Sequence, residues 1–471
     1  MAVYSIIKLS ELEGAKRIDP EFYHPEKIIS KKALDKVGIR RIKDCFYNVR
    51  QIFDPQKHNL NDTAYVFDLS DIKSFFLSDG KIALSSEDVG SAKKMFSKND
   101  VLISRLRPYL KEVSFVGFNG KAKLASTEFI VLRQKDKDYY PEVLFSFLIS
   151  HHVQNILLWS IAGTEHPRFH DSYLLNLKLP NIPIEFQNKI KELVKEAWKF
   201  FLTSQSLYSQ AENLLLEELG LKDFKPRYQK TYTAKLSDAF SAHRIDAEYF
   251  QPAYEEVVEG LKKRIKVEKL KNVVSFINHG KQPYYVENGD IPVLIQKHLG
   301  SQLLSSYSEI INMPDTPKTD RNFIKNYPEY LIKPFDVLFY SVGAYLGRTN
   351  VVLENFEAVP ASFITLIRTK KEICNPIYLA LFLNSEIGQL QSTKWKSASA
   401  QQYIYPKEIR EFVIPILPLS TQQKIASLVQ ESYKARKKAK ELLEAAKRAV
   451  EIAIEKNEEE ALKYISKTVW N

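Results

Sequence analysis

Two stretches of the chain carry apolar and small residues at alternating steps of three and four. The first set is Ile190, Leu193, Ala197, Phe200, Ser204, Leu207, Ala211 and Leu214, and the second is Ile425, Leu428, Ser432, Ala435, Ala439, Leu442, Ala446 and Ala449. Spacing of this kind, sustained over more than three heptads, predicts two long helices that each pack on another helix through a narrow seam. The many Ala and Ser positions would let the two backbones approach closely.

These stretches belong to a larger internal repeat. Three motifs occur twice in the same order, at a nearly constant offset of about 235 residues. They are Arg17-Ile18-Asp19 with Arg244-Ile245-Asp246, Asp100-Val101-Leu102 with Asp336-Val337-Leu338, and Pro183 through Gln187 with Pro418 through Gln422. A unit of this length is too long for a solenoid repeat and suits one domain followed by a connector. We infer a tandem duplication.

Residues that start and stop helices frame both stretches. Pro183 and Pro418 stand just before them, where a helix start tolerates proline, and Gly220 followed by Pro226 ends the first stretch. Each helix of about 40 residues would span roughly 60 Å. Each could pack on its own domain, but the duplicated helix is the better partner for so narrow a seam. If the two helices pair antiparallel, a pseudo-twofold axis crosses them and the domains lie at opposite ends in inverted orientation.

The segments between the helices have mixed patterns. Short apolar runs at 65–67, 101–103, 129–132 and 364–367 predict strands, whereas 144–159 and 376–390 have the spacing of helices. We expect an α+β fold with two tandem globular domains separated by two long antiparallel coiled-coil helices. The expected parts are a first domain at 1–180, a central helix at 181–226, a second domain at 227–415, a C-terminal helix at 416–457 and a tail at 458–471.

The composition adds an argument from charge. With 68 Lys and Arg against 57 Asp and Glu, the chain of 471 residues has a formal net charge of +11, which favours a polyanionic partner such as double-stranded DNA. No apolar run has membrane-spanning length and no secretory signal is recognisable, so a cytoplasmic location is expected. Cys45 and Cys374 are too few and too far apart for a Cys-rich metal site, and they are typical of reduced, buried residues.

Basic, amide and aromatic residues gather in the predicted loops. Arginine suits guanine, Gln suits adenine and Lys suits phosphate, although a solvated basic loop is the usual explanation for any one of them. The candidates for DNA contact are Arg105, Arg107, Tyr109, Lys111, His166 and Arg168 in the first repeat, and Tyr345, Arg348, Lys394, Lys396, Gln401 and Gln402 in the second.

No catalytic pattern is recognisable. A GxxxxGK[ST] phosphate loop is absent. The run Asn375-Pro376-Ile377-Tyr378 only faintly resembles the Asn-Pro-Pro-Tyr element of adenine methyltransferases, because it lacks the second proline and begins a predicted helix. The pairs His151-His152 and His166 with His170 could suggest a metal, but the first lies in an apolar helix and the second lacks convincing Cys or acidic partners. We expect neither catalytic residues nor a metal.

Together these features resemble the specificity subunit of type I restriction–modification enzymes, over residues 1 to about 457. The resemblance lies in the duplication, in the repeated Asp-Val-Leu strand with its basic loop, and in the run into each long helix. Those runs are 179–187 and 416–423, which keep one Pro and the Gln of the family's Pro-Pro-Leu-x-x-Gln pattern. The stretch 397–404 is also similar to the family, whereas 164–168 in the first copy departs from it.

The resemblance implies a division of labour. Each globular domain would be a target-recognition domain that reads one half of a split DNA target. The helices would set the spacer and dock two modification subunits that hold S-adenosylmethionine, while restriction subunits would use ATP and Mg²⁺. This chain would then be non-catalytic and hold no cofactor. Two other functions stay open: a DNA-associated scaffold without sequence specificity, and a stand-alone DNA methyltransferase.

Overall fold

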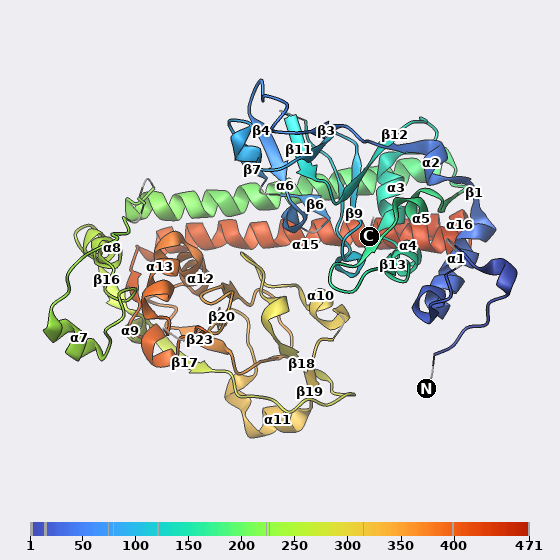
Figure 1. Ribbon diagram of the computed structural model, residues 1–471. Coiled ribbons are helices and arrows are strands. Elements are labelled where there is room, and N and C mark those ends of the chain that lie inside the picture. The colour runs from blue at the N-terminus through green and yellow to red at the C-terminus, as the bar shows by residue number, and fades with distance from the viewer. Residues whose placement is uncertain are drawn as a thin grey trace. The chain divides into compact units, whose positions relative to one another are not determined.

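The computed structural model describes residues 3–13, 17–73, 75–78, 80–119, 122–222, 224–225, 227–313, 315–397 and 400–469. The chain divides into two units (Figure 1). Unit 1 is Met1–Phe201 with Lys438–Asn471, and unit 2 is Leu202–Lys437. Each unit therefore holds one globular part and one half of each of the two long helices, α6 (Ile184–Leu219) and α15 (Leu419–Glu455).

Unit 1 mixes short helices with two sheets. Its other helices are α1 (Pro25–Val37), α2 (Ile42–Cys45), α3 (Pro141–Leu148), α4 (His151–Leu158), α5 (Asp171–Leu175) and α16 (Glu458–Val469). One sheet has the order β10-β9-β12-β2 and the other the order β3-β8-β11-β4-β7. The strands of these sheets are β2 (Phe46–Asn48), β3 (Ile52–Phe53), β4 (Ala64–Phe67), β7 (Lys81–Ala83), β8 (Lys93–Phe96), β9 (Val101–Ser104), β10 (Val113–Phe115), β11 (Ala122–Ser126) and β12 (Phe129–Gln134). Paired shorter strands are β1 (Gly38–Arg41) with β15 (Lys178–Pro180), β5 (Ile72–Lys73) with β6 (Phe76–Leu77), and β13 (Ile161–Ala162) with β14 (Arg168–Phe169).

Unit 2 contains a sheet with the order β17-β23-β20-β21. Read from its other end, β21-β20-β23-β17, it matches the order β10-β9-β12-β2 of the first sheet of unit 1 strand for strand. Its helices are α7 (Leu236–Ala242), α8 (Pro252–Lys262), α9 (Leu270–Val273), α10 (Tyr307–Asn312), α11 (Arg321–Asn326), α12 (Pro376–Asn384), α13 (Glu386–Trp395) and α14 (Pro406–Ile409). Its strands are β16 (Val267–Lys269), β17 (Val274–His279), β18 (Ile291–Leu294), β19 (Lys318–Thr319), β20 (Val337–Tyr340), β21 (Thr349–Val351), β22 (Val359–Pro360), β23 (Ile364–Thr369) and β24 (Val413–Pro415). Neighbours in both of these sheets run antiparallel.

The repeated Asp-Val-Leu motif has the same structural role in both units. Its apolar residues form β9 and β20, which are buried along their whole length. The preceding aspartates, Asp100 and Asp336, are buried and each accepts two hydrogen bonds from an arginine on the next strand, Arg133 or Arg368. Such bidentate pairs satisfy a buried carboxylate and fix the strand register. The predicted duplication is therefore visible in the three-dimensional structure.

The predicted helices 144–159 and 376–390 were wrong as single elements, because each is two helices. The first breaks before Ser150 and the second at Ser385. Both serine hydroxyls donate to the carbonyl three residues earlier, at 2.6 Å. A serine side chain that bonds the backbone in this way competes with helical hydrogen bonding, and both serines have extended backbone angles.

The long helices begin where the sequence predicts. α6 starts directly after Pro183 and α15 directly after Pro418. Gly220 follows the end of α6 with a φ of +65°, and the Leu221 N–H donates to the Leu216 carbonyl, which closes the last turn. Pro226 lies outside the described residues, as do Trp470 and Asn471 of the predicted tail.

A buried glutamine secures the start of each long helix. Gln187 and Gln422 are 3% and 0% exposed, and each side chain makes three hydrogen bonds of 2.8–3.1 Å to the backbone. The partners of Gln187 are the Tyr140 N–H and the carbonyls of Asp138 and Ile182, and those of Gln422 are the Asn375 N–H and the carbonyls of Ile373 and Leu417. The repeated glutamine therefore joins the long helix to the loop before α3 or α12.

Within each unit the two long helices share a core. In unit 1 the first half of α6 and the second half of α15 contribute Ile190, Leu193, Ala197, Ala439, Leu442 and Ala449. In unit 2 the second half of α6 and the first half of α15 contribute Tyr208, Ala211, Leu215, Ile425, Ala426 and Val429. Because the first half of one helix packs with the second half of the other in both units, the helices run antiparallel (Figure 1).

Part of the predicted seam is displaced by one residue. Leu207, Leu214 and Leu428 are only half-buried, whereas their neighbours Tyr208, Leu215 and Val429 are buried; Ala435 is buried as predicted. A strict seven-residue pattern drifts by about 20° per heptad around a straight helix with 3.6 residues per turn. The buried face therefore moves one position along as the helix proceeds.

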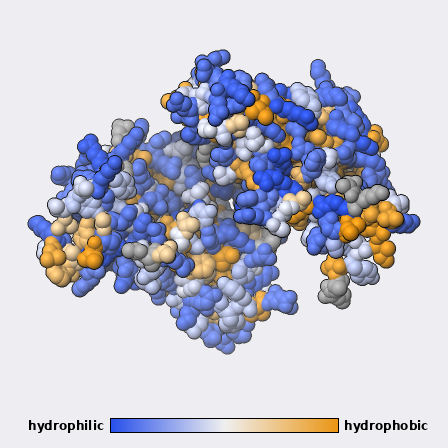
Figure 2. All heavy atoms as spheres, viewed as in Figure 1, coloured by the Kyte–Doolittle hydropathy of each residue, from blue (hydrophilic) through white to orange (hydrophobic). Residues whose placement is uncertain are grey.

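The surface of the described part is largely hydrophilic (Figure 2). Hydrophobic residues are exposed in the segment that opens each repeat, at equivalent positions: Leu9 and Ile18 in unit 1, and Leu236 and Ile245 in unit 2. Among the described helices, none is long and apolar enough to cross a membrane.

Candidate DNA interface

In unit 1 the loop after β9 is held against a second loop from the end of the repeat. The Arg107 N–H donates to the Pro167 carbonyl at 2.8 Å, and the Phe169 N–H donates to the Arg105 carbonyl at 3.2 Å. The Arg105 N–H in turn donates to the Glu128 carbonyl at 3.1 Å. These bonds bring together the predicted contact residues at 105–111 and 166–168.

Unit 2 has the same backbone frame. The Gly343 N–H donates to the Gln402 carbonyl at 2.8 Å, and the Ile404 N–H donates to the Ser341 carbonyl at 2.9 Å. The Ser341 N–H donates to the Phe363 carbonyl at 2.9 Å. The three bonds match those of unit 1 one for one, so Arg105 corresponds to Ser341, Arg107 to Gly343 and Glu128 to Phe363.

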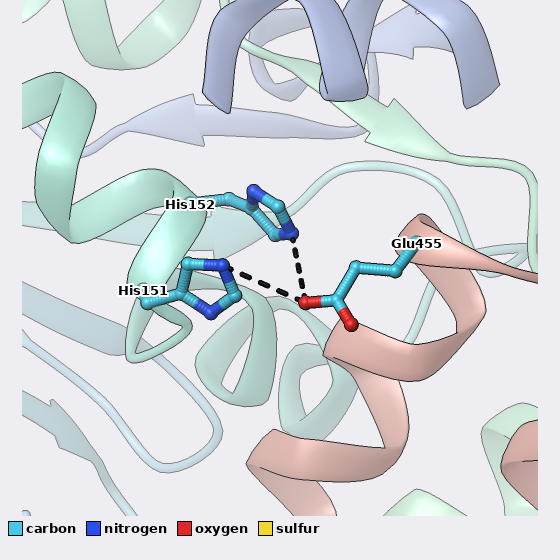
Figure 3. Close-up of side chains that lie close together, drawn as sticks. All are labelled: His151, His152 and Glu455. Carbon is cyan, nitrogen blue, oxygen red and sulfur yellow. Dashed lines mark ion pairs between the residues drawn. The ribbon is translucent and has the colours of Figure 1, made fainter. Parts of the chain in front are cut away.

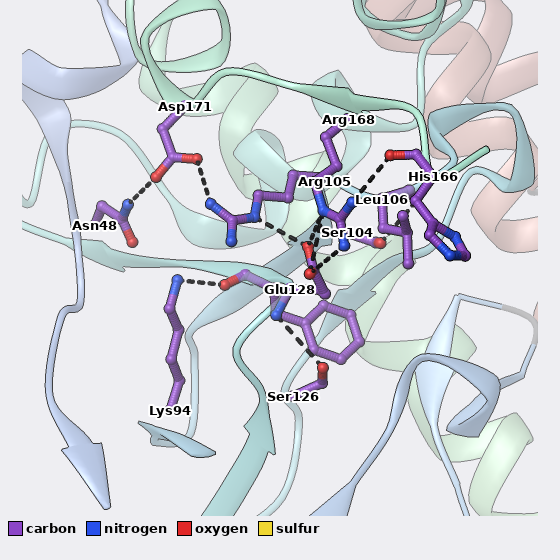
Figure 4. Close-up of polar contacts among 11 residues, drawn as sticks. Asn48, Lys94, Ser104, Arg105, Leu106, Ser126, Glu128, His166, Arg168 and Asp171 are labelled. Atoms are coloured by element: carbon purple, nitrogen blue, oxygen red, sulfur yellow. Dashed lines mark hydrogen bonds and ion pairs between the residues drawn. The ribbon is translucent and has the colours of Figure 1, made fainter. Parts of the chain in front are cut away.

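Two of the predicted arginines are paired with one carboxylate (Figure 4). Arg105 Nε donates to Glu128 at 3.1 Å, and Arg168 donates to both Glu128 oxygens, with Nη2 at 2.8 Å. Hydrogen bonds from Arg168 and Arg105 lower the pKa of Glu128, so it remains a carboxylate. Because both guanidinium groups are held by Glu128, their main effect is to position the two loops. Glu128 was not predicted, and no spacing in the sequence connects it to either arginine.

Arg107 lies in a different environment. Its backbone has a φ of +48°, which is uncommon for a residue with a Cβ, and its counterpart Gly343 has a φ of +80°. Among the described residues it forms no ion pair with a carboxylate, although its charge acts on Glu112; Nη2 lies 3.5 Å from the His166 ring. Tyr109 and Lys111 are exposed beside it. The cationic group in this loop is therefore available to a ligand.

The corresponding face of unit 2 is polar and aromatic. The Arg348 guanidinium lies 4.0 Å from the ring centroid of Tyr345, and its Nη1 donates to the Leu299 carbonyl at 2.9 Å. Burial lowers the pKa of Arg348. A hollow of about 440 Å³ beside this loop is lined by Gly343, Ala344, Leu346, Gln389, Ser392, Thr393, Lys396, Ala400, Gln401 and Gln402. Three predicted residues, Lys396, Gln401 and Gln402, therefore share one hollow.

The arginine of the repeated Arg-Ile-Asp motif donates to a backbone carbonyl near these loops in each unit. Arg17 is paired with Asp19 and its Nη2 donates to the Ile161 carbonyl at 3.1 Å. Arg244 is paired with Asp246 and its Nη2 donates to the Lys396 carbonyl at 2.9 Å. In each unit the motif thus holds the chain where it leaves α4 or α13.

Two predicted lysines face the protein. The ammonium group of Lys394 is paired with Glu255, and that of Lys396 lies 3.8 Å from Glu248. Their side chains are only 18% and 22% exposed. Contact of either ammonium group with DNA would require these ion pairs to open.

Two features considered in the sequence are structural. The Asn375 side chain accepts hydrogen bonds from the Ile377 and Tyr378 N–H groups, so the Asn-Pro-Ile-Tyr run caps α12. His170 caps α5 by accepting from the Ser172 N–H. By contrast, the structure brings His151 and His152 to Glu455.

The fold thus has two related α+β units, and each unit includes half of each long helix. Residues 262–446 match the family model "Type I restriction modification DNA specificity domain". This stretch of the chain is therefore similar to the DNA-specificity domain of type I restriction–modification systems. No curated protein matches the sequence of the chain.

Three solved structures are similar over most of the chain. One comes from work on complex assembly and conformational transition of the type I R-M system (20% identity, 91% of this chain and 96% of that chain, TM-score 0.31). The others are the HsdS subunit from Thermoanaerobacter tengcongensis (19%, 89% and 95%, 0.31) and the type I S subunit from M. genitalium (13%, 90% and 95%, 0.40).

Proposed function

We propose that each repeat reads one half of a split DNA target. The observation that carries this proposal is the shared backbone frame with unlike side chains. At corresponding positions unit 1 has Arg105 and Arg107, whereas unit 2 has Ser341 and Gly343. Two surfaces built alike but bearing different donors and acceptors suit two different base sequences.

Arg107 is the proposed base reader of unit 1. A left-handed backbone costs an L-residue about 1–2 kcal/mol, and the other repeat avoids that cost with Gly343. An arginine at this position therefore needs a functional reason, and a guanidinium group suits two acceptors of guanine in the major groove. In this proposal Lys111 binds phosphate. In unit 2, Gln401 and Gln402 have the amide groups that suit adenine.

The long helices would set the distance between the half-targets and dock two modification subunits. In this proposal those subunits hold S-adenosylmethionine, and separate restriction subunits use ATP and Mg²⁺. The specificity subunit contributes recognition and no catalysis. Its helices suit a spacer of fixed length, because two packed helices bend less than one isolated helix.

Methylation mapping tests this proposal. Long-read sequencing of the host genome, with and without the gene, is expected to show one bipartite motif that loses its methylation when the gene is absent. A scaffold would leave the motif unchanged, and the purified chain would bind DNA with a salt dependence but little preference for sequence. Methyl transfer by the purified chain alone would instead favour the stand-alone methyltransferase.

A further inference from the structure

In unit 1 the first residues of α4 lie against the last residues of α15. His151 and His152 begin α4, and Glu455 ends α15 (Figure 3). The three side chains point toward one another, and one potential ligand atom from each lies within 4.8 Å of the other two. About 300 residues of chain separate the histidines from the glutamate, so only folding brings them together.

The distances fit metal ligands better than hydrogen bonds. The Nε2 atoms of His151 and His152 lie 3.6 Å and 3.5 Å from the same oxygen of Glu455. A protein hydrogen bond to oxygen is usually about 2.7–3.2 Å long. Ligands at about 2.0–2.1 Å from a tetrahedral zinc ion are roughly 3.4 Å apart. Both nitrogen–oxygen separations are close to that tetrahedral edge.

His152 supplies an independent observation. It is 5% exposed, and neither of its ring nitrogens has a hydrogen-bond partner in the described structure. A buried polar group without a partner is unfavourable and calls for an unseen ligand.

Glu451 orients the other histidine. It is 4% exposed and accepts hydrogen bonds of 2.9 Å from both the His151 Nδ1 and the His151 backbone N–H. When a carboxylate accepts a hydrogen bond from the N–H of one ring nitrogen, the lone pair of the other ring nitrogen is free to bind a metal.

Arg448 is a positively charged residue that contacts both of these glutamates. Its guanidinium group donates to Glu451 and to both oxygens of Glu455 at 3.2 Å. These hydrogen bonds fix the orientation of both side chains. A carboxylate oxygen has two lone pairs, so the oxygen of Glu455 that faces the histidines can accept from Arg448 and still bind a metal.

We propose that His151, His152 and Glu455 bind one divalent transition-metal ion of the zinc type, with a water as the fourth ligand. Two imidazole nitrogens and one carboxylate oxygen are a common zinc ligand set. The ion would join α4 to the end of α15 and so fix the globular part of unit 1 on the long helix.

Metal titration of the full-length chain tests this site. The chain is first treated with a chelator, and then Zn²⁺ is added in a calorimeter. One ion per chain is expected, and Co²⁺ is expected to give the visible absorption of a tetrahedral site. The variants Glu455→Gln and His151→Ala are expected to weaken Zn²⁺ binding at least about tenfold. His58→Ala and Glu458→Gln change exposed residues of the same types in unit 1 and are the controls.

Thermal unfolding gives a second readout. Zn²⁺ is expected to raise the Tm of the wild-type chain and of both controls, because a ligand that binds only the folded state stabilises it. His152→Phe fills a similar volume without ring nitrogens, so it is expected to fold and to show no Zn²⁺-dependent rise. Unchanged binding in Glu455→Gln and His151→Ala, or no saturable binding by the wild-type chain, would overturn the proposal.

Discussion

The Ser204 and Ser432 hydroxyl oxygens lie 3.1 Å apart between α6 and α15, and the Ser432 hydroxyl is also 2.7 Å from the Ser204 carbonyl oxygen. Both residues are buried in unit 2. A side-chain oxygen can reach a backbone carbonyl of the facing helix only where the two helices come very close. Small residues at this position are therefore a requirement of the packing.

Enlarging one of these serines should destabilise unit 2. Ser432→Leu is expected to lower the free energy of unfolding by about 1–3 kcal/mol, because extra volume in a tightly packed seam forces the helices apart. Glu431→Leu places the same side chain at the exposed neighbouring position and is expected to change it by less than about 0.5 kcal/mol. Urea unfolding measures the free energy of unfolding of both variants. Equal effects of Ser432→Leu and Glu431→Leu would show that the seam can hold a larger side chain and would contradict the prediction.

The two buried glutamines should be equally important for stability. Gln187→Ala and Gln422→Ala each leave three backbone groups without partners, and an unsatisfied buried group costs about 1–3 kcal/mol. A loss of about 3 kcal/mol is expected for each, against less than about 0.5 kcal/mol for the exposed Gln423→Ala. If Gln187→Ala unfolds like the wild-type chain in urea, the first helix start does not depend on this contact.

Lys27 should make stability depend on pH. It is 3% exposed and its ammonium group has no hydrogen-bond partner among the described residues; burial lowers its pKa to about 7. The unfolded chain keeps a lysine pKa near about 10.4, so between these values the unfolded state binds more protons and stability rises with pH. Lys27→Met should reduce this rise, as measured by urea unfolding at about pH 7 and about pH 9. Identical pH dependence in both proteins would contradict the prediction.

Arg107→Gly should separate stability from recognition. Glycine removes the strain of the left-handed backbone but increases the conformational entropy of the unfolded chain. Because the two effects oppose each other, the free energy of unfolding is expected to change by less than about 1 kcal/mol. The free energy of binding to the methylated motif should become less favourable by about 1–3 kcal/mol. Lys111→Gln should instead weaken binding to all DNA alike and reduce the salt slope by about one. Fluorescence anisotropy at several salt concentrations distinguishes them; unchanged target affinity of Arg107→Gly would remove Arg107 as a base reader.

The fold was accessible from the sequence where the pattern was long or repeated. The spacing of Ile190, Leu193 and Ala197 predicted α6, and Pro183 with Gly220 marked its ends. The break at Ser150 was not predicted, because a serine in an apolar run is also compatible with a continuous helix. The sequence predicted Leu207 in the seam, but Tyr208 is buried there instead. A strict heptad pattern does not include the gradual rotation of the buried face around a straight helix.

The interface was less accessible. The sequence selected the loops at 105–111 and 166–168 from their composition, and the structure brings them together through backbone bonds that leave no sequence pattern. Glu128 neutralises Arg105 and Arg168 from a turn between two strands, a relationship set by tertiary structure alone. Which of these side chains touch bases remains a prediction.

The central claim is that the two globular domains read DNA independently, and a domain exchange tests it most directly. Residues 1–180 are replaced by those of a type I specificity subunit with a known, different target, and the methylated motif is mapped in cells that carry the hybrid. The account predicts that one half of the bipartite motif changes and the other half stays as it was. A hybrid that is active but has both halves altered would contradict it.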